Sequence, residues 1–368
     1  MSSIYEMRLH KLRGYLEKER IEIALITNPT NIYYYTGFHS NPHERFMGLI
    51  VDLGRARESM ILPALDLEAA QQHAFVRELI PCSDSENPYN LLREQVGRTR
   101  IGALGLEKKA VNLHQVEQLQ GLFAGLQVMD IEPFIIKERL VKSEQDLVSI
   151  RRAVDIAEKV LESTVQNVRV GMMEQELAAE LAYKMRMFGG DKPAFESIIL
   201  TGKRSAMPHG KPGACAIQEN DFVLFDFGVY MEGFCSDITR TFLMGEGTKE
   251  QSTIYETVLT ANLAAIQAVK VGFPYGTIDQ AGRSVIAAMG YGAYFNNRIG
   301  HGLGMDLHEA PSIHGESEML IEPGHVFTIE PGIYLSSLGG VRIEDDVYVH
   351  PDGHVEVLTR YPKQLRRL

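Results

Sequence analysis

The chain has 368 residues, which is more than one hydrophobic core usually supports, so two domains are expected. Its 45% hydrophobic and 23% charged residues are ordinary for a globular protein and exclude a disordered or coiled-coil chain. The formal net charge of −11, with no long basic run, argues against nucleic acid or an anionic membrane as a partner.

The cysteines and the start of the chain concern the cellular compartment. Cys82, Cys215 and Cys235 are too few and too scattered for a disulfide framework or a CxxC zinc site, which indicates reduced thiols. The N-terminus is a charged amphipathic pattern that lacks the apolar core of a signal peptide. No uninterrupted apolar stretch approaches the ~20 residues of a membrane-spanning helix. We therefore expect a cytoplasmic protein.

The first third of the chain alternates short apolar runs with amphipathic stretches. The runs 21–27, 46–53, 59–62 and 101–106 predict buried strands, and the stretches 5–19, 67–75 and 113–123 predict helices. This alternation is typical of an α/β layer domain, which we place at residues 1–135. No catalytic constellation is visible in it.

A capping-box pattern marks the start of the second domain. Ser143 and Asp146 predict the start of a long helix that runs to about residue 167. We place the boundary near Arg139 and the second domain at 140–368. Further helices are predicted at 173–188, at 249–271 after the Thr248/Gln251 pair, and at 277–289. Strand-like runs surround the acidic motifs.

The run DFVLFDFGVYMEGFCSDITRTF predicts a β-hairpin. Its two β-prone arms are separated by Met231, Glu232 and Gly233, a candidate three-residue turn. With the turn centred between Met231 and Glu232, Asp226 is expected opposite Asp237. Facing side chains have Cβ atoms about 4.5–5.5 Å apart, and two like charges at that distance are destabilising. A cation between them would remove the repulsion.

A second hairpin repeats this arrangement in HVFTIEPGIYLSSLGGVRIEDDVYV. With a centre near Ser337, Glu330 is expected opposite Glu344. The alternative is that Arg240, Arg342 and backbone donors neutralise the acids as structural ion pairs. For one buried acid that alternative is the better one, but two opposed pairs favour metal. Unpaired buried charges cost several kcal/mol or more, and two divalent ions would offset four carboxylates.

Three histidines accompany these acids. His301 lies between glycines in RIGHGLG, which let the backbone approach a site closely. A lone histidine is usually a packed or surface residue, but His301 accompanies four acids that need a cation. His308 and His209, the latter in RSAMPHGKPG, could equally be loop residues. Four oxygen donors with one nitrogen donor favour Mn²⁺, with Co²⁺ or Zn²⁺ as alternatives.

Together these motifs resemble the pita-bread metallopeptidases of family M24: prolidases (Xaa-Pro dipeptidases), Xaa-Pro aminopeptidases and, more distantly, methionine aminopeptidases. The motifs are PHG at 208–210, DFG at 226–228, SDITRTF at 236–242, GHGLG at 300–304, HEAP at 308–311, TIEPG at 328–332 and VRIEDD at 341–346. NPTNIYYYTGF and PHERF look like the front of bacterial prolidases. The resemblance implies an α/β (α+β) chain with an N-terminal creatinase/prolidase-like domain and a C-terminal pita-bread catalytic domain.

The resemblance also implies two divalent metal ions per subunit and a homodimer formed through the N-terminal domain. Asp237 and Glu344 would bridge both ions. Asp226 would complete one ligand set, and His301 and Glu330 would complete the other. All five positions are filled here, which argues against a non-catalytic binding protein of this fold, the remaining alternative from another functional class.

A hydrolytic mechanism follows from such a centre. Two metal ions can share a water and generate a hydroxide that attacks the scissile carbonyl. Glu330 is the candidate to accept and shuttle the proton. His308 and His209 would stabilise the tetrahedral oxyanion or steer the substrate. Arg342 precedes Glu344 by two residues on a strand, so it would share its face and orient it or a substrate carboxylate.

The expected substrate is a short peptide with proline second, because an Xaa-Pro bond lacks an amide hydrogen and needs a dedicated site. Many prolidases read HExPR where this chain has HEAPS, so Ser312 stands where an arginine could hold the free carboxylate of the proline. A dipeptidase and an Xaa-Pro aminopeptidase acting on longer peptides both stay open. Some bacterial prolidases use the partner subunit's N-terminal loop, and His43 and Arg45 in NPHERF are the candidates for that role.

Overall fold

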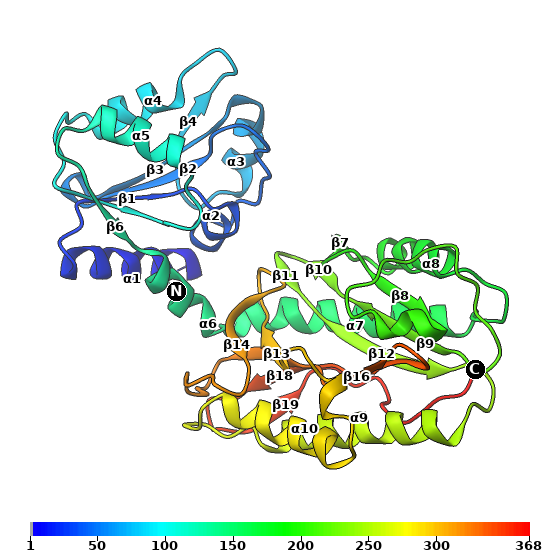
Figure 1. The fold of residues 1–368 in the computed structure, drawn as a ribbon. Coiled ribbons are helices and arrows are strands. Elements are labelled where there is room, and N and C mark those ends of the chain that lie inside the picture. The colour runs from blue at the N-terminus through cyan, green and yellow to red at the C-terminus, as the bar shows by residue number, and fades with distance from the viewer. Residues whose placement is uncertain (1–2) are drawn as a thin grey trace. The chain divides into compact units, whose positions relative to one another are not determined.

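The computed structural model describes residues 3–368, which divide into two compact units (Figure 1). The first unit ends at Glu138 and the second begins at Arg139. Among the helices of residues 3–368, none combines the length and the apolar character needed to cross a membrane.

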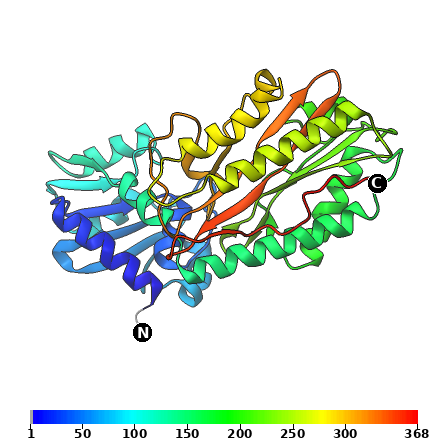
Figure 2. The same cartoon turned by 90° about the horizontal axis from the view of Figure 1, so that it is seen from below.

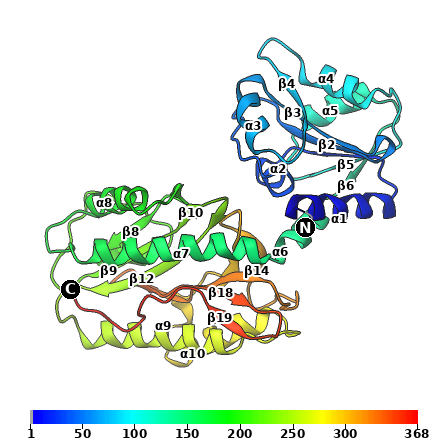
Figure 3. The same cartoon turned by 180° about the vertical axis from the view of Figure 1, so that it is seen from behind.

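The first unit is a six-stranded mixed sheet with the strand order β4-β3-β2-β1-β5-β6. Its strands are β1 (Ile23–Ile26), β2 (Gly48–Asp52), β3 (Arg57–Pro63), β4 (Glu78–Cys82), β5 (Ala103–Leu106) and β6 (Gln127–Asp130). Its helices are α1 (Ile4–Lys18), α2 (Pro29–Thr36), α3 (Leu67–His73), α4 (Pro88–Val96), α5 (Leu113–Leu122) and α6 (Glu132–Leu140), which ends in the second unit. Figure 3 shows α4 and α5 on one side of the sheet and α1 on the other.

Burial explains which elements of this unit were predictable. All four residues of the central strand β1 are buried, and α1 buries Leu9, Leu12 and Leu16 along one face. Each strand and helix predicted from the pattern is present, with ends that agree within two residues. The edge strands β4 and β6 were missed because they are only partly buried and carry little apolar pattern.

The second unit contains four long helices and several short sheets. The helices are α7 (Glu144–Val165), α8 (Glu174–Met187), α9 (Lys249–Gln267) and α10 (Gly276–Ala288). The strands of its first part are β7 (Lys192–Pro193), β8 (Ile198–Thr201), β9 (Phe222–Phe227), β10 (Val229–Met231), β11 (Phe234–Cys235) and β12 (Ile238–Leu243). Those of its second part are β13 (Gly300–Gly302), β14 (Glu309–Ile313), β15 (Val326–Ile329), β16 (Gly332–Leu335), β17 (Gly339–Arg342), β18 (Asp345–Val349) and β19 (Val355–Val357).

Two apolar cores fill this unit, one on each side of the strands. In one core α7 and α8 pack on β8, β9 and β12, and in the other α9 and α10 pack on the strands from β15 to β18 (Figure 1). The capping boxes predicted at Ser143/Asp146 and Thr248/Gln251 are both present. The four helices are confirmed, although α9 ends four residues before the predicted end.

The C-terminal segment runs back beside α7 and α9, as Figure 2 shows in red. The backbone N–H of Tyr361 donates to Glu158 on α7, and Lys363 Nζ donates to Asn262 on α9. The same lysine pairs with the fully buried Asp345, which also binds Arg240. This ion cluster connects β18 to β12 and, through Lys363, to α9, while the backbone of the C-terminal segment contacts α7.

Candidate metal centre

The first acidic hairpin has a different register from the predicted one. Asp226 on β9 lies opposite Thr239 on β12, so the predicted pairing of Asp226 with Asp237 is wrong. The physical reason is the turn, which consists of two residues, Glu232 and Gly233, with φ of 48° and 86°. This left-handed pair is the geometry of a tight two-residue hairpin.

The two aspartates nevertheless meet. Asp237 is two residues from Thr239, so its side chain is on the face of the sheet that carries Thr239 and Asp226. Residues in this diagonal relation are about 7–8 Å apart, which long polar side chains and a cation can bridge. When the centre of the turn moves by one residue, the partner of each residue on the opposite strand moves by two. Because side chains alternate between the two faces of a strand, the new partner lies on the same face of the sheet as the old one.

The second acidic hairpin has the predicted register. Gly332 pairs with Arg342 on one side of a short gap, and Ile329 pairs with Asp345 on the other. Glu330 and Glu344 lie within that gap, at positions that face each other in the same register. The prediction is therefore confirmed for the strands that flank both glutamates.

Backbone hydrogen bonds from these two glutamates connect the two hairpins to each other and to the segment that carries His301. The backbone N–H of Glu344 donates to the Thr239 carbonyl on β12 at 3.1 Å. The backbone N–H of Glu330 donates to the carbonyl of Ile299 at 2.7 Å, next to β13, which carries His301. Four segments distant in sequence thus meet at one place.

Glycines flank His301 because neighbouring strands leave no room for a side chain. A Cβ on Gly300 would lie 2.0 Å from the carbonyl oxygen of Thr328, and one on Gly302 would lie 1.9 Å from that of Ala310. The close approach inferred from the sequence is therefore confirmed.

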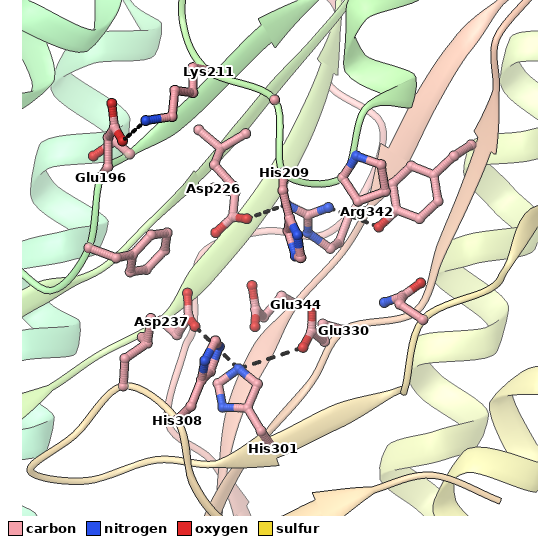
Figure 4. A pocket seen from close by; sticks show the side chains of 18 of the residues that line it. Glu196, His209, Lys211, Asp226, Asp237, His301, His308, Glu330, Arg342 and Glu344 are labelled. Atoms are coloured by element: carbon pink, nitrogen blue, oxygen red, sulfur yellow. Dashed lines mark hydrogen bonds and ion pairs between the residues drawn. The ribbon is translucent and has the colours of Figure 1, made fainter. Parts of the chain in front are cut away.

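The side chains line a cavity of about 570 Å³ (Figure 4). The residues predicted for the site that line it are His209, Asp226, Asp237, His301, His308, Glu330, Arg342 and Glu344. Asp237, His301 and Glu344 offer ligand atoms that all lie within 4.8 Å of one another. His301 Nε2 lies 3.7 Å from Asp237 Oδ2 and 3.6 Å from Glu330 Oε1.

Burial and mutual repulsion raise the pKa values of the acids. Burial, followed by the charges of Glu344 and Asp226, raises the pKa of Asp237 well above its usual range. Burial and the neighbouring acids do the same to the pKa of Glu344. Burial raises the pKa of Glu330 to about 7. Without a cation, therefore, these carboxyl groups resist ionisation together.

The hydrogen bonds of His301 show that a cation fits between these groups. Its Nδ1 is 3.0 Å from the carbonyl oxygen of Gly302, which can only accept, so Nδ1 carries the proton. Burial lowers the pKa of His301 to about 3, so the ring is neutral and Nε2 presents a lone pair to the carboxylates. In addition, the buried Oδ1 of Asp237 has no hydrogen-bond partner within residues 3–368. Lone pairs without donors that converge in this way suit a divalent cation.

The alternative of structural ion pairs accounts for one acid only. Arg342 pairs with Asp226, whereas Arg240 binds Asp345, outside the cavity. Among the arginine ion pairs of residues 3–368, none involves Asp237, Glu330 or Glu344. Arginine therefore neutralises one of the four predicted acids.

Arg342 reaches Glu344 through an intermediary. Its Nη1 donates to the Tyr334 hydroxyl at 2.8 Å and its Nη2 binds Asp226. Its Nε donates to the hydroxyl of Thr239 at 3.1 Å, and that hydroxyl donates to Glu344 Oε2 at 2.6 Å. Arg342 is therefore connected to Glu344 through the hydroxyl of Thr239, and its role in orienting Glu344 or a substrate carboxylate stays a prediction.

The other predicted residues fall into two places. The ring of His308 packs edge-on against that of His301 with centroids 4.3 Å apart, and both His308 and His209 line the cavity (Figure 4). His43 and Arg45 belong to the first unit, where Arg45 Nε pairs with Asp84 at 2.7 Å. Their suggested role in a partner subunit stays a prediction.

Arg298 is one of the polar cavity residues that the sequence reasoning missed. Arg298 lines the cavity, and its Nη1 donates to the Ser312 hydroxyl at 3.1 Å. Its charge contributes to lowering the pKa of His308, after burial. The available signal was Ser312, because a site without the expected arginine at that position can take its cation from a neighbouring segment, here the loop that leads into β13.

Comparisons with known proteins agree on one family. Residues 148–351 match the model described as metallopeptidase family M24, and residues 8–141 match that of the creatinase/prolidase N-terminal domain. The dipeptidase candidate YkvY of Bacillus subtilis (strain 168) is 38% identical over 360 residues, which are 97% of this chain and 99% of that protein.

Two solved structures with different activities resemble the chain almost equally. The Xaa-Pro dipeptidase from Bacillus anthracis superimposes with a TM-score of 0.91 at 32% identity, over 99% of this chain and 100% of that one. The X-Pro aminopeptidase from Thermotoga maritima MSB8 gives a TM-score of 0.90 at 30% identity, over 98% and 99%. The overall fold therefore does not separate the two activities.

Proposed function

The chain belongs to metallopeptidase family M24 and carries the creatinase/prolidase N-terminal domain, and on that premise we propose that it hydrolyses Xaa-Pro dipeptides with two divalent metal ions. The observation that carries the proposal is the convergence of buried carboxylates on the neutral Nε2 of His301. Burial and mutual repulsion oppose ionisation of Asp237, Glu330 and Glu344, so a bound cation would stabilise the charged form of the cluster.

We assign the metal ligands as the sequence predicted them. The ions would be held by Asp226, Asp237, His301, Glu330 and Glu344, the ligand set that the family resemblance implies. The mainly oxygen-donor set suits Mn²⁺, with Co²⁺ and Zn²⁺ as alternatives. When bound, the ions would polarise the scissile carbonyl and lower the pKa of a water.

The protein groups around the ions would divide the remaining work. Glu330 lies at the edge of the acidic cluster and would accept the proton of the attacking water and pass it to the departing nitrogen. His308 and His209 line the same cavity and would donate hydrogen bonds to the oxyanion or orient the substrate. Arg342 would hold Asp226 directly and Glu344 through Thr239.

Arg298 supports the choice of a dipeptide. A dipeptide ends in a carboxylate next to the bond that is cut, and the guanidinium of Arg298 lies in the cavity close to the strand position of Ser312. We propose that it binds this carboxylate in place of the arginine that HEAPS lacks. Longer peptides have no charge at that point and would gain nothing from it.

The alternative activity is an Xaa-Pro aminopeptidase. Two observations favour it. Ser312 stands where an arginine could bind the free carboxylate of a dipeptide, and the chain is similar to the X-Pro aminopeptidase from Thermotoga maritima MSB8. A binding protein without catalysis is the remaining alternative, and the complete acidic cluster speaks against it.

The deciding experiment compares an Xaa-Pro dipeptide with an Xaa-Pro-Yaa tripeptide, using protein that is stripped by a chelator and then given Mn²⁺. We expect restored cleavage of the dipeptide alone. Cleavage of the tripeptide would move the assignment to the aminopeptidase, and cleavage of neither would favour the binding protein. Arg298→Gln should raise KM for the dipeptide about tenfold or more, because a hydrogen bond to a charged group is worth about 1.5–3 kcal/mol.

The metal ligands have their own test. Asp237→Asn removes one proposed bridging charge, so we expect a lower metal-to-protein ratio and a loss of hydrolysis. Asp155→Asn, an exposed position on α7, is the matched control. If the Asp237 variant keeps both its metal and its activity, the ligand assignment is wrong.

A further inference from the structure

A buried ion cluster lies behind the loop that carries His308. The segment 303–308 connects β13 to β14 without regular secondary structure. The side chain of Glu309, at the end of this loop, folds back beneath it and is only 7% exposed. Its Oε1 accepts the backbone N–H of Asp306 at 3.0 Å.

The loop is shaped around this carboxylate. A Cβ on Gly304 would lie 2.7 Å from Glu309 Oε2, so only glycine leaves the carboxylate its present place. The start of the loop is held by other bonds, since Leu303 donates to Val326 and Cys235 donates to the Gly304 carbonyl. Within the loop, the backbone N–H of Gly304 also donates to the Asp306 carbonyl at 3.2 Å, and the Glu309 carboxylate holds the middle of the loop from outside it, at the Asp306 N–H.

Two cations from the first residues of the second unit hold Glu309 in turn. Arg139, at the end of α6, binds Glu309 and also pairs with the side chain of Asp306 at 2.7 Å. Lys142 Nζ lies 3.2 Å from Glu309 Oε2, and its side chain is 2% exposed. The two positive charges outweigh burial and lower the pKa of Glu309 to about 2.

Stability alone does not explain such a cluster. Removing three charged groups from water costs several kcal/mol per ion, and well-packed apolar residues often stabilise a fold as well or better. What apolar residues would not provide is the fixed hydrogen bond to the Asp306 backbone. The residue that follows this fixed segment into the cavity is His308, whose ring packs on that of His301 (Figure 4).

We propose that Arg139 and Lys142 are positioning residues of the active site, which act through Glu309 to hold the loop 303–308 and so place the imidazole of His308 in the cavity. This inference rests on the proposed function, in which His308 contacts the substrate. A displacement of about 1 Å in such a group can lower the rate about 100-fold.

A double-mutant cycle tests the coupling. Arg139→Met is measured in the wild type and in His308→Ala, with Mn²⁺-loaded full-length protein and the Xaa-Pro dipeptide. We expect a 10- to 100-fold loss of kcat/KM in the wild type and no more than about threefold in the His308→Ala background. Arg139→Lys, which keeps the charge, should recover part of the loss. Arg151→Met removes the surface pair with Glu356 and is the matched control.

Each outcome bears on the proposal. Equal losses from Arg139→Met in both backgrounds would overturn it, because a general structural effect does not depend on His308. If circular dichroism shows that Arg139→Met does not fold, Lys142→Met replaces it in the cycle, because Lys142 is the other cation that binds Glu309. If the unaltered protein cleaves no Xaa-Pro peptide, the proposed function fails first. If it cleaves the peptide and the cycle is additive, only this inference fails.

Discussion

Thr239 links Arg342 to Glu344, which is one of the acids of the cluster. Its buried hydroxyl accepts from Arg342 Nε and donates to Glu344 Oε2. Groups that orient metal ligands in this way are typically worth 10- to 100-fold in metal affinity or activity. Loss of this single hydroxyl is therefore expected to lower metal affinity or activity by a comparable factor.

Thr239→Val keeps the shape of the side chain and removes both hydrogen bonds. We expect Mn²⁺ affinity and kcat/KM to fall by roughly 10- to 100-fold, measured by metal titration and dipeptide hydrolysis. Thr239→Ser retains the hydroxyl and should stay close to the wild type. Wild-type metal affinity in the valine variant would show that Thr239 does not orient Glu344.

His325 predicts how stability depends on pH. The residue is buried and its Nδ1 lies 2.9 Å from the Tyr275 hydroxyl. Burial, with a smaller effect from the charge of Lys142, lowers its pKa from 6.5 to about 4. The unfolded chain then binds the proton more readily than the folded one, so stability is complete above pH 6.5 and is lost as pH falls towards 4.

The loss at His325 should amount to roughly 3 kcal/mol, because each pKa unit corresponds to about 1.4 kcal/mol. His325→Gln does not titrate, so its stability should fall less between pH 7 and pH 4. Urea unfolding followed by circular dichroism at several pH values measures both proteins. If the free energies of unfolding of the two proteins fall in parallel as the pH is lowered, His325 is not the group that causes the loss.

At the scale of single residues, the sequence was informative where one buried polar group required a second one close to it. Opposed acids in buried strands, with a histidine between glycines, led to five residues that converge in the structure. Arg298 was missed because a single arginine in a loop has no pattern. The intermediary between Arg342 and Glu344 was missed because it depends on side-chain directions that strand alternation alone does not give.

At the scale of secondary-structure elements, the two hairpins show how far the register could be predicted from the sequence. In the second one, the predicted centre agrees with the observed register. In the first, the permissive Gly233 indicated the turn but not that Glu232 also adopts a left-handed conformation. That single backbone angle separates a two-residue turn from a three-residue one. Local backbone conformation of a non-glycine residue is what the sequence pattern did not determine.

Gly233→Ala tests the turn. Its φ of 86° is costly for any residue with a Cβ, so we expect a loss of about 1–2 kcal/mol in the free energy of unfolding. Gly233→Asn should lose less, because asparagine tolerates the left-handed region better. Hydrolysis per folded molecule should stay unchanged, since the buried strands β9 and β12 hold the register. A stability equal to the wild type would exclude a strained turn.

For the whole molecule, the sequence predicted two α/β parts in the right order, because strand and helix periodicities alternate differently in each. It did not show how the sheets of the second unit come together around the cavity, since the bonds from Glu330 and Glu344 to other strands are non-local. The homodimer, and the place of His43 and Arg45 in it, stay predictions that concern two chains.

A mixing experiment decides whether a partner chain completes the site. One chain carries Asp237→Asn with an intact loop, and the other carries His43→Ala and Arg45→Ala with an intact metal centre. If the loop serves the partner's cavity, each protein alone is impaired, but a mixed dimer contains one complete site. Because half of randomly assorted dimers are mixed, co-refolding should restore roughly a quarter of the wild-type sites. A mixture no more active than the average of its parts, or a monomer in sedimentation, would contradict the shared site.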